Sequence, residues 1–287
     1  MLMTTKLRGL FQREKILVVP GAFDAMSAKL IEAAGFEAVY MTGFGTAASI
    51  LGLPDIGLIT MTEMIENAKR ISDAVNIPVI ADADTGYGNH LNAIRTIREY
   101  EKAGVAAIHI EDQIFPKKCG HMEGSKLIPL EEMAAKVRAA AASKKDKDFV
   151  LIVRTDAISS EGFEAAIRRG NAYVGEGADV IFIEAPKTMD QLEKIPKLIK
   201  APVLINMAPK TPNLPFKKFE EMGYAIIIYP SLSLTASFLA IKERLLELKE
   251  NGIVRQWAEL GVPFEEMIGF LGVKEYEQME EKFLRKA

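Results

Sequence analysis

Eight short apolar runs, each followed by a segment of helical periodicity, set the pattern of this chain. The runs lack clean alternation of apolar and polar residues, which is typical of parallel strands covered on both faces. They predict strands at residues 16–20, 38–42, 78–83, 106–111, 149–154, 180–185, 202–206 and 225–229. Apolar residues at helical spacing predict helices at residues 25–34, 60–75, 90–103, 130–143, 161–176, 189–199, 216–222 and 232–249. This continuous alternation predicts an α/β protein with a closed (β/α)8 barrel of the TIM type, not an open sheet.

The sequence after Gly252 has a different character. Segments 253–260, 264–271 and 275–285 are helical by pattern and carry large aromatic side chains, among them Trp257, Phe264 and Phe283. We therefore expect a catalytic barrel domain over residues 1–252 and a helical tail over residues 253–287. Because a large exposed apolar surface usually marks an interface, we expect the tail to pack on its own barrel or on a neighbouring subunit.

Composition narrows the class of protein. The chain has 287 residues, of which 49% are hydrophobic and 26% charged, as in a globular protein with a substantial core. The net charge of −3 gives no sign of a nucleic-acid partner, and no apolar run is long enough to cross a membrane. A single cysteine cannot form an internal disulfide. We expect a cytoplasmic protein with a small-molecule partner.

Polar side chains gather where the predicted strands end. Active sites of TIM-type barrels lie at the carboxyl ends of the strands. One polar residue at such a place is ordinarily a helix cap or a solvated turn, but charged and amide residues at several successive strand ends indicate a site. The candidates are Tyr40, Thr42, Asp82, Asp84, Glu111, Arg154, Glu184, Asn206 and Tyr229.

Three of these residues, Asp82, Asp84 and Glu111, form a candidate metal site. Alternation along an extended chain places Asp82 and Asp84 on the same side, and Glu111 ends the next strand. Converging carboxylates repel one another, and a hard divalent cation relieves that repulsion. We expect Mg²⁺, with Mn²⁺ as the second choice. The alternative, in which the aspartates cap a helix or pair with Arg154, is less favoured because they lead into a glycine-rich turn.

A second candidate is the loop that contains the single cysteine. A lone cysteine is usually a small buried apolar residue. Cys119 instead lies in a polar segment with Lys117, Lys118 and His121, which are surroundings that favour a thiolate. We expect Cys119 to be a nucleophile or a proton donor, and His121 to be its partner or a ligand of a substrate carboxylate. His109, inside an apolar run, is expected to be a structural histidine.

Seven motifs resemble the isocitrate lyase / phosphoenolpyruvate mutase superfamily, over essentially the whole chain. They are Pro20-Gly-Ala-Phe-Asp24, Tyr40-Met-Thr-Gly43, Leu53-Pro-Asp55, Asp82-Ala-Asp-Thr-Gly-Tyr-Gly88, Glu111-Asp-Gln113, Lys117-Lys-Cys-Gly-His121 and Arg154-Thr-Asp156. The cysteine loop resembles that of the carbon–carbon lyase branch, which includes 2,3-dimethylmalate lyase and 2-methylisocitrate lyase. Phosphonate mutases and oxaloacetate decarboxylases of the superfamily usually lack this cysteine.

This resemblance implies a Mg²⁺-dependent retro-aldol cleavage. The substrate would be a 2-hydroxy dicarboxylate or tricarboxylate of the 2,3-dimethylmalate or 2-methylisocitrate type, and the products pyruvate, or a related 2-oxo acid, and a carboxylate. The resemblance implies metal ligation by Asp82, with Asp84, Glu111 and Asp55 reaching the ion directly or through water. It makes Tyr40 a candidate base and Cys119 the acid that protonates the carbanion.

The remaining roles implied by the resemblance concern substrate binding. Arg154 and the backbone N–H groups of residues 42–44 would hold the 2-oxo-acid half, while Lys118 and His121 would stabilise developing charge. The catalytic set is then Cys119, Tyr40, Lys117, Lys118, His121 and Arg154. The substrate-binding set is Thr42, Gly43, Phe44, Asp55, Gly120, Glu184 and Asn206.

Some questions stay open at the level of sequence. The segments after the last two predicted strands contain no arginine for a third carboxylate. Lys210 could take its place, but its surroundings are apolar, so an alkyl-substituted malate is favoured over 2-methylisocitrate. Oxaloacetate hydrolase and a carboxyphosphonoenolpyruvate phosphonomutase-like enzyme are alternatives, and a non-catalytic small-acid binding protein is the alternative from another class. Since members of the superfamily exchange C-terminal helices and form dimers of dimers, we expect a homotetramer with part of residues 232–285 on a neighbouring barrel.

Overall fold

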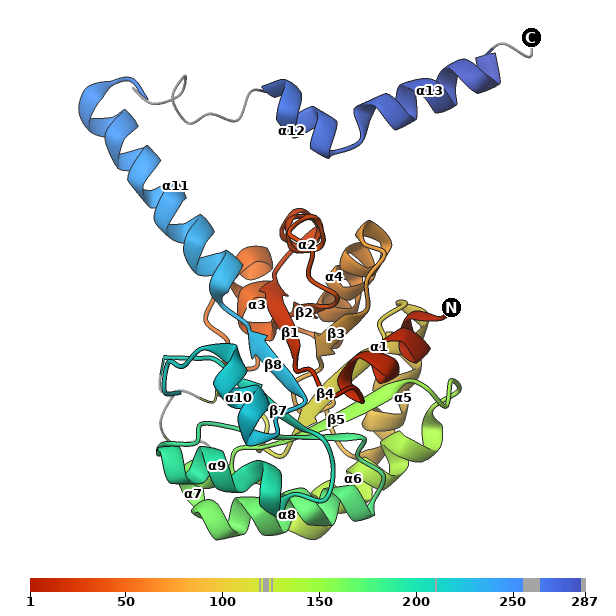
Figure 1. Cartoon of the computed structure of the whole chain (residues 1–287), viewed down its shortest axis with the longest axis vertical. Helices are drawn as coiled ribbons and strands as arrows, with labels where there is room; N and C mark the ends of the chain where they lie inside the picture. The colour runs from red at the N-terminus through yellow and green to blue at the C-terminus, as the bar shows by residue number, and fades with distance from the viewer. Residues whose placement is uncertain (119, 121–123, 125, 210, 255–263, 285–287) are drawn as a thin grey trace. The chain divides into compact units, whose positions relative to one another are not determined.

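The computed structural model describes residues 1–118, 120, 124, 126–209, 211–254 and 264–284. Within these residues eight strands close into a barrel, in which each strand runs parallel to its neighbours and β8 pairs with β1 (Figure 1). The strands are β1 (Leu17–Ala22), β2 (Val39–Met41), β3 (Val79–Asp82), β4 (Ala107–Glu111), β5 (Val150–Thr155), β6 (Val180–Ile183), β7 (Val203–Asn206) and β8 (Ile226–Tyr229). The predicted TIM-type barrel and its strands are confirmed.

Helices surround the ring of strands in the barrel part of Figure 1. The helices of the described residues are α1 (Met3–Phe11), α2 (Ala25–Ala33), α3 (Gly43–Leu51), α4 (Met61–Ala74), α5 (His90–Lys102), α6 (Leu130–Ser143), α7 (Ala157–Ser160), α8 (Phe163–Gly175), α9 (Met189–Leu198), α10 (Phe216–Met222), α11 (Leu232–Asn251), α12 (Phe264–Phe270) and α13 (Val273–Leu284). Each predicted helix between the strands is present. Helices α1, α3 and α7 were not predicted.

Two apolar layers account for the lack of alternation in the strands. One layer fills the barrel interior and includes Leu17, Tyr40 and Ile152, while the other lies between strands and helices and includes Leu151 and Val153. Successive residues of one strand therefore enter different layers, and both are buried. The interior layer also includes residues of α1, so the N-terminal helix adds to the core. Polar side chains replace apolar ones only toward the carboxyl ends of the strands.

The described chain divides into two compact units, Met1–Ala236 and Ser237–Ala287, and the division falls within α11. The second unit contains α12 and α13, which match the predicted helices 264–271 and 275–285, whereas most of the predicted helix 253–260 lies outside the described residues. The domain boundary at residue 252 stays a prediction. In the described part of the chain, each helix is too short or too polar to span a membrane.

Candidate active site

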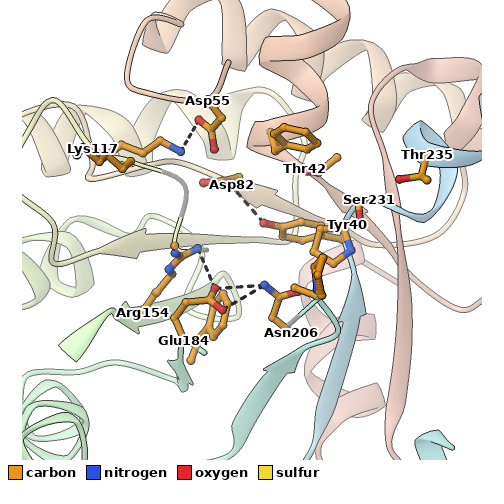
Figure 2. Close-up of a pocket in the computed structure, with 17 residues that line it drawn as sticks. Tyr40, Thr42, Asp55, Asp82, Lys117, Arg154, Glu184, Asn206, Ser231 and Thr235 are labelled. Atoms are coloured by element: carbon orange, nitrogen blue, oxygen red, sulfur yellow. Dashed lines mark hydrogen bonds and ion pairs between the residues drawn. The ribbon is translucent and has the colours of Figure 1, made fainter. Parts of the chain in front are cut away.

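A cavity of about 320 Å³ lies at the carboxyl ends of the strands (Figure 2). Its walls come from β2, β3 and β5 to β7 and from the loops that follow the strands. The residues that line it are Tyr40, Thr42, Phe44, Asp55, Asp82, Lys117, Lys118, Gly120, Arg154, Phe182, Glu184, Asn206, Ala208, Pro209, Pro230, Ser231 and Thr235. Most substrate-binding residues implied by the sequence are thus brought to one cavity. Cys119 and His121 lie outside the described residues.

Strand register explains why residues far apart in sequence meet here. Asp82 at the end of β3 is paired with His109, and Glu111 at the end of β4 is paired with Arg154. Side chains alternate across a strand, so His109 and Glu111 point into the barrel together. The predicted strand-end residues therefore lie at the same end of the barrel as the inward-pointing side chains of His109 and Glu111.

An ammonium group lies among the carboxylates of this site. Lys117 Nζ is 2.6 Å from Asp55 Oδ1 and 2.7 Å from Asp84 Oδ1, and all three side chains are buried (Figure 2 shows the pair with Asp55). Burial alone would lower the pKa of Lys117, but Asp84 and the other nearby carboxylates outweigh it and hold that pKa well above its ordinary value. Burial raises the pKa of Asp84 to about 6, even though Lys117 acts in the opposite direction.

The other two candidate metal ligands differ in their surroundings. Asp82 Oδ2 accepts a hydrogen bond from the backbone N–H of Gly43 at 3.2 Å. Burial would raise the pKa of Asp82, but the charges around it, Lys117 among them, bring the pKa below its ordinary value. Burial raises the pKa of Glu111 well above its ordinary value, and Glu111 Oε1 has no hydrogen-bond partner within the described residues.

These residues can be tested for their fit to Mg²⁺. Among the described residues, no three side chains of His, Cys, Asp or Glu are close enough to hold an ion, and Lys117 lies between Asp55 and Asp84. The donor set nevertheless suits Mg²⁺, since carboxylate oxygens are its preferred protein ligands and Glu111 Oε1 is an unpartnered acceptor. Metal ligation by Asp82, Asp84 and Glu111 stays a prediction.

Arg154, at the end of β5, is a further buried cation of the cavity lining. Its Nε and Nη2 donate hydrogen bonds to Asp156 at 2.9 and 2.7 Å, and it lies 3.3 Å from Glu111 and 3.2 Å from Glu184. Burial disfavours the charged guanidinium, but Asp156 and the other acids raise the pKa of Arg154 well above its ordinary value. Asp156 was not predicted as a site residue, although its spacing from Arg154 placed both side chains on one side of an extended chain.

Tyr40 lies between the acidic cluster and His109. Its hydroxyl is 2.8 Å from His109 Nε2 and 3.5 Å from Asp82 Oδ2, and the two rings are stacked with centroids 5.7 Å apart. Burial raises the pKa of Tyr40 well above its ordinary value and lowers that of His109 to about 4, so both rings are uncharged at neutral pH. His109 is buried as expected, yet it also contacts the site. Its spacing from Glu111 was the signal for this contact.

Lys118 and Gly120, the described residues on either side of position 119, are held close to the site. Gln113 Nε2 donates to the carbonyl of Lys118 at 2.8 Å, and the Lys118 N–H donates back to Gln113 Oε1 at 3.0 Å. Gly120 lies directly against Arg154, because a Cβ atom at this position would be 2.1 Å from Arg154 Nη2. A glycine is therefore required at position 120 if the loop is to stay against the arginine.

The remaining wall of the cavity is less charged. Asn206 Nδ2 donates to Glu184 Oε2 at 3.2 Å, which links the ends of β6 and β7 (Figure 2). Beyond them the lining consists of small, apolar or hydroxyl side chains, which the sequence analysis did not assign to the site. They follow β7 and β8 in the sequence, and this position after a strand end could have marked them as site residues. They are Ala208, Pro209, Pro230, Ser231 and Thr235.

A parallel barrel whose strand ends gather buried carboxylates, an arginine and lysines around one cavity defines an enzyme of the TIM-barrel type. Residues 7–249 match the family model described as phosphoenolpyruvate phosphomutase. The chain is 44% identical to 2,3-dimethylmalate lyase of Eubacterium barkeri over 280 residues, which is 97% of each chain. It is 41% identical to 2-methylisocitrate lyase of Aeropyrum pernix over 283 residues, 98% of this chain and 91% of the relative.

Solved structures show the same relationship. Oxaloacetate acetylhydrolase in complex with 3,3-difluorooxalacetate matches with a TM-score of 0.93 at 35% identity, covering 98% of this chain and 96% of that chain. Phosphonopyruvate hydrolase in complex with oxalate and Mg²⁺ matches with a TM-score of 0.91 at 31% identity, covering 99% and 100%. The chain belongs to the PEP mutase/isocitrate lyase superfamily, and it is a carbon–carbon lyase of that superfamily.

Proposed function

We propose that this lyase cleaves an alkyl-substituted malate, 2,3-dimethylmalate foremost, into pyruvate and propionate. The observation that carries the proposal is the contrast between the two ends of the cavity. One end has Lys117, Lys118 and Arg154, whereas the described lining after β7 and β8 has no cationic side chain. A dicarboxylate fits such a cavity, because a third carboxylate would require a further cation. The 44% identity to 2,3-dimethylmalate lyase supports the same choice.

Different groups of residues carry different parts of the reaction. Arg154 and the backbone N–H of Phe44 bind the half that becomes the 2-oxo acid, and the buried guanidinium fixes its orientation. The N–H groups of Thr42 and Gly43 already donate to the Ala22 carbonyl and to Asp82 Oδ2. Asp82, Asp84 and Glu111, with Asp55 behind Lys117, are the residues that would hold Mg²⁺. When bound, Mg²⁺ would polarise the oxygen on C2.

Tyr40 receives the proton of the C2 hydroxyl in this proposal. Because burial raises its pKa, Tyr40 can accept this proton only if it passes its own to a neighbour. His109 Nε2 and Asp82 Oδ2 are acceptors within 3.5 Å. As the C2–C3 bond breaks, its electron pair goes to C3, and Cys119 delivers a proton there. Lys118 and His121 stabilise the negative charge that develops on the half of the substrate that contains C3.

A direct assay separates the proposal from its alternatives. The purified protein is supplied with 2,3-dimethylmalate, 2-methylisocitrate, oxaloacetate and phosphonopyruvate, with Mg²⁺ or with EDTA. We expect pyruvate release from 2,3-dimethylmalate to have the highest kcat/KM and to stop in EDTA. Faster release of pyruvate from 2-methylisocitrate would make the tricarboxylate the substrate, and oxalate release from oxaloacetate would indicate the hydrolase. No turnover of any compound, with tight binding of one, would indicate a small-acid binding protein.

We also propose a homotetramer located in the cytoplasm. The second unit exposes large aromatic side chains, since Phe264 is 66% exposed and Tyr276 and Phe283 are each 70% exposed. Contact with another subunit would remove these surfaces from water. Light scattering tests the assembly, and a monomer at micromolar concentration would contradict it. Truncation after Gly252 tests the role of the tail, because a folded, active monomer would show that the tail serves only its own barrel.

A further inference from the structure

The turn that carries Asp84 has an unfavourable backbone. Asp84 has φ +48° and Tyr87 has φ +59°, and both are side-chain-bearing residues in the left-handed region. L-residues rarely adopt this conformation, and it persists only where surrounding contacts impose it. The turn connects β3 to α5, and it contains Asp84, one of the candidate metal ligands. Its shape therefore decides where the Asp84 carboxylate lies.

Side chains from two helices hold this turn by its carbonyl groups and by Tyr87. From α5, Thr96 Oγ1 donates to the Gly86 carbonyl at 3.1 Å, and the hydroxyls of Tyr87 and Tyr100 are 2.9 Å apart. From α6, Lys136 Nζ donates to the Thr85 carbonyl at 3.0 Å. The Thr85 carbonyl belongs to the peptide between Thr85 and Gly86, one residue beyond Asp84, so of these contacts on carbonyl groups this one lies nearest to Asp84 in the sequence.

Lys136 is an unusual residue to find in this position. It is 3% exposed, and no carboxylate within the described residues forms an ion pair with it. Burial lowers the pKa of Lys136, which shows that its charged form is disfavoured there. A buried ammonium with a single carbonyl partner adds little to folding stability and often reduces it. Stability alone therefore does not account for the lysine, and its contact with the strained turn does.

We propose that Lys136 is a positioning residue, which holds the Thr85 carbonyl and thereby fixes Asp84 in the orientation needed to bind a divalent cation. This inference rests on the proposed metal dependence of the enzyme. It concerns the preorganisation of the ligand and not the chemistry of cleavage, so metal affinity is the quantity that should change.

The sign of the effect separates positioning from simple electrostatics. Lys136 is close enough to Glu111 and Asp112 for its charge to interact with theirs. A positive charge next to the site repels a divalent cation, so by charge alone Lys136→Met would tighten metal binding. Positioning predicts the opposite, because the turn that carries Asp84 would lose the contact that opposes its strain.

The test is a calorimetric titration with Mn²⁺ of the full-length protein. We expect Lys136→Met and Lys136→Leu to raise the Mn²⁺ Kd by about 10-fold or more, the usual effect of losing a group that orients a metal ligand. Lys144→Met is the matched control. Lys144 lies just beyond the end of α6 and is bound to Asp179 at 2.9 Å, far in sequence from the turn. Its replacement should leave the Mn²⁺ Kd unchanged.

A double-mutant cycle shows whether Lys136 acts through Asp84. In the Asp84→Asn background, Lys136→Met should change the Mn²⁺ Kd by less than about twofold, since residues that act as a unit are not additive. An unchanged or lower Kd for Lys136→Met in the original background would overturn the inference, and so would equal losses in both backgrounds. If the unaltered protein binds no Mn²⁺, both the proposed metal dependence of the enzyme and the inference about Lys136 fail.

Discussion

Replacement of Arg154 by methionine should destabilise the protein and abolish turnover. The guanidinium is the shared cation of Glu111, Asp156 and Glu184, and its side chain is 10% exposed. Removing one partner of a buried ion pair typically costs about 3–5 kcal/mol, because the remaining charge is left without compensation. With three acids around it, we expect Arg154→Met to lie at the upper end of this range.

The loss should depend on pH, with a definite sign. In the wild-type protein Arg154 lowers the pKa of Glu111 against the effect of burial, so Arg154→Met should raise that pKa further. A carboxyl group with a raised folded-state pKa holds extra protons when folded, and its contribution to stability is lost as the pH rises from the unfolded toward the folded value. In the variant, where the pKa of Glu111 is higher, stability continues to fall with rising pH after it has levelled off in the wild-type protein. The difference in unfolding free energy between the two should therefore be larger at pH 8 than at pH 5.5.

Urea denaturation followed by circular dichroism at both pH values measures this difference. Arg138→Met is the control, because Arg138 pairs with Glu176 on the surface and its side chain is 66% exposed. The control should scarcely move the denaturation midpoint at either pH. A loss below about 1 kcal/mol for Arg154→Met, or a loss equal at both pH values, would refute the view that Arg154 compensates buried negative charge.

Three further changes test the site. Asp82→Ala should abolish both turnover and Mn²⁺ binding without loss of the far-ultraviolet circular dichroism spectrum; retained Mn²⁺ affinity would exclude Asp82 as a ligand. Cys119→Ser should lower kcat by roughly 10²-fold, the scale of general acid catalysis, with little change in Tm, whereas a large fall in Tm with normal kcat would make the cysteine structural. Gly120→Ala should reduce kcat strongly, since the new Cβ would meet Arg154, while Gly9→Ala, which has open space, should not.

The strands were predictable because each is short, apolar and bounded by turns. Helix α3 was not, because it begins with Gly43, Phe44 and Gly45, and glycine is unfavourable inside helices. In the structure Thr42 supplies the missing stability locally, since its side chain accepts a hydrogen bond from the Gly45 N–H. Tertiary burial of Ala47 completes the helix. Both contributions depend on the position of the segment in the barrel, which a local pattern does not contain.

The candidate site, like the fold, was predictable in part. Residues that end strands were found from the sequence, because the barrel places every strand end on one face. The ion pairs of Lys117 with Asp55 and Asp84 were not found, since Asp55 lies in a loop and its distance from Lys117 depends on the path of two loops. Lys136 was also missed, because the pattern of an alanine-rich helix gave no reason to single out its one lysine.

Two adjacent acids, the last residue of β4 and the residue that follows it, show how strand register builds both the site and its support. Glu111 pairs with Arg154 inside the barrel, whereas Asp112, one residue later, is buried toward the helices and accepts a hydrogen bond from Tyr173 of α8 at 2.8 Å. Asp112 also accepts from Thr155 Oγ1 at 2.7 Å and from the Asp156 N–H at 3.1 Å.

Asp112 therefore fixes the backbone at the end of β5, the strand that carries Arg154. A shift of one residue in the pairing of β4 with β5 would exchange these two acids between the cavity and the helix layer. The carboxylate that compensates Arg154 and the carboxylate that anchors its strand would both be lost. The same register that forms the barrel therefore specifies the charges of the site.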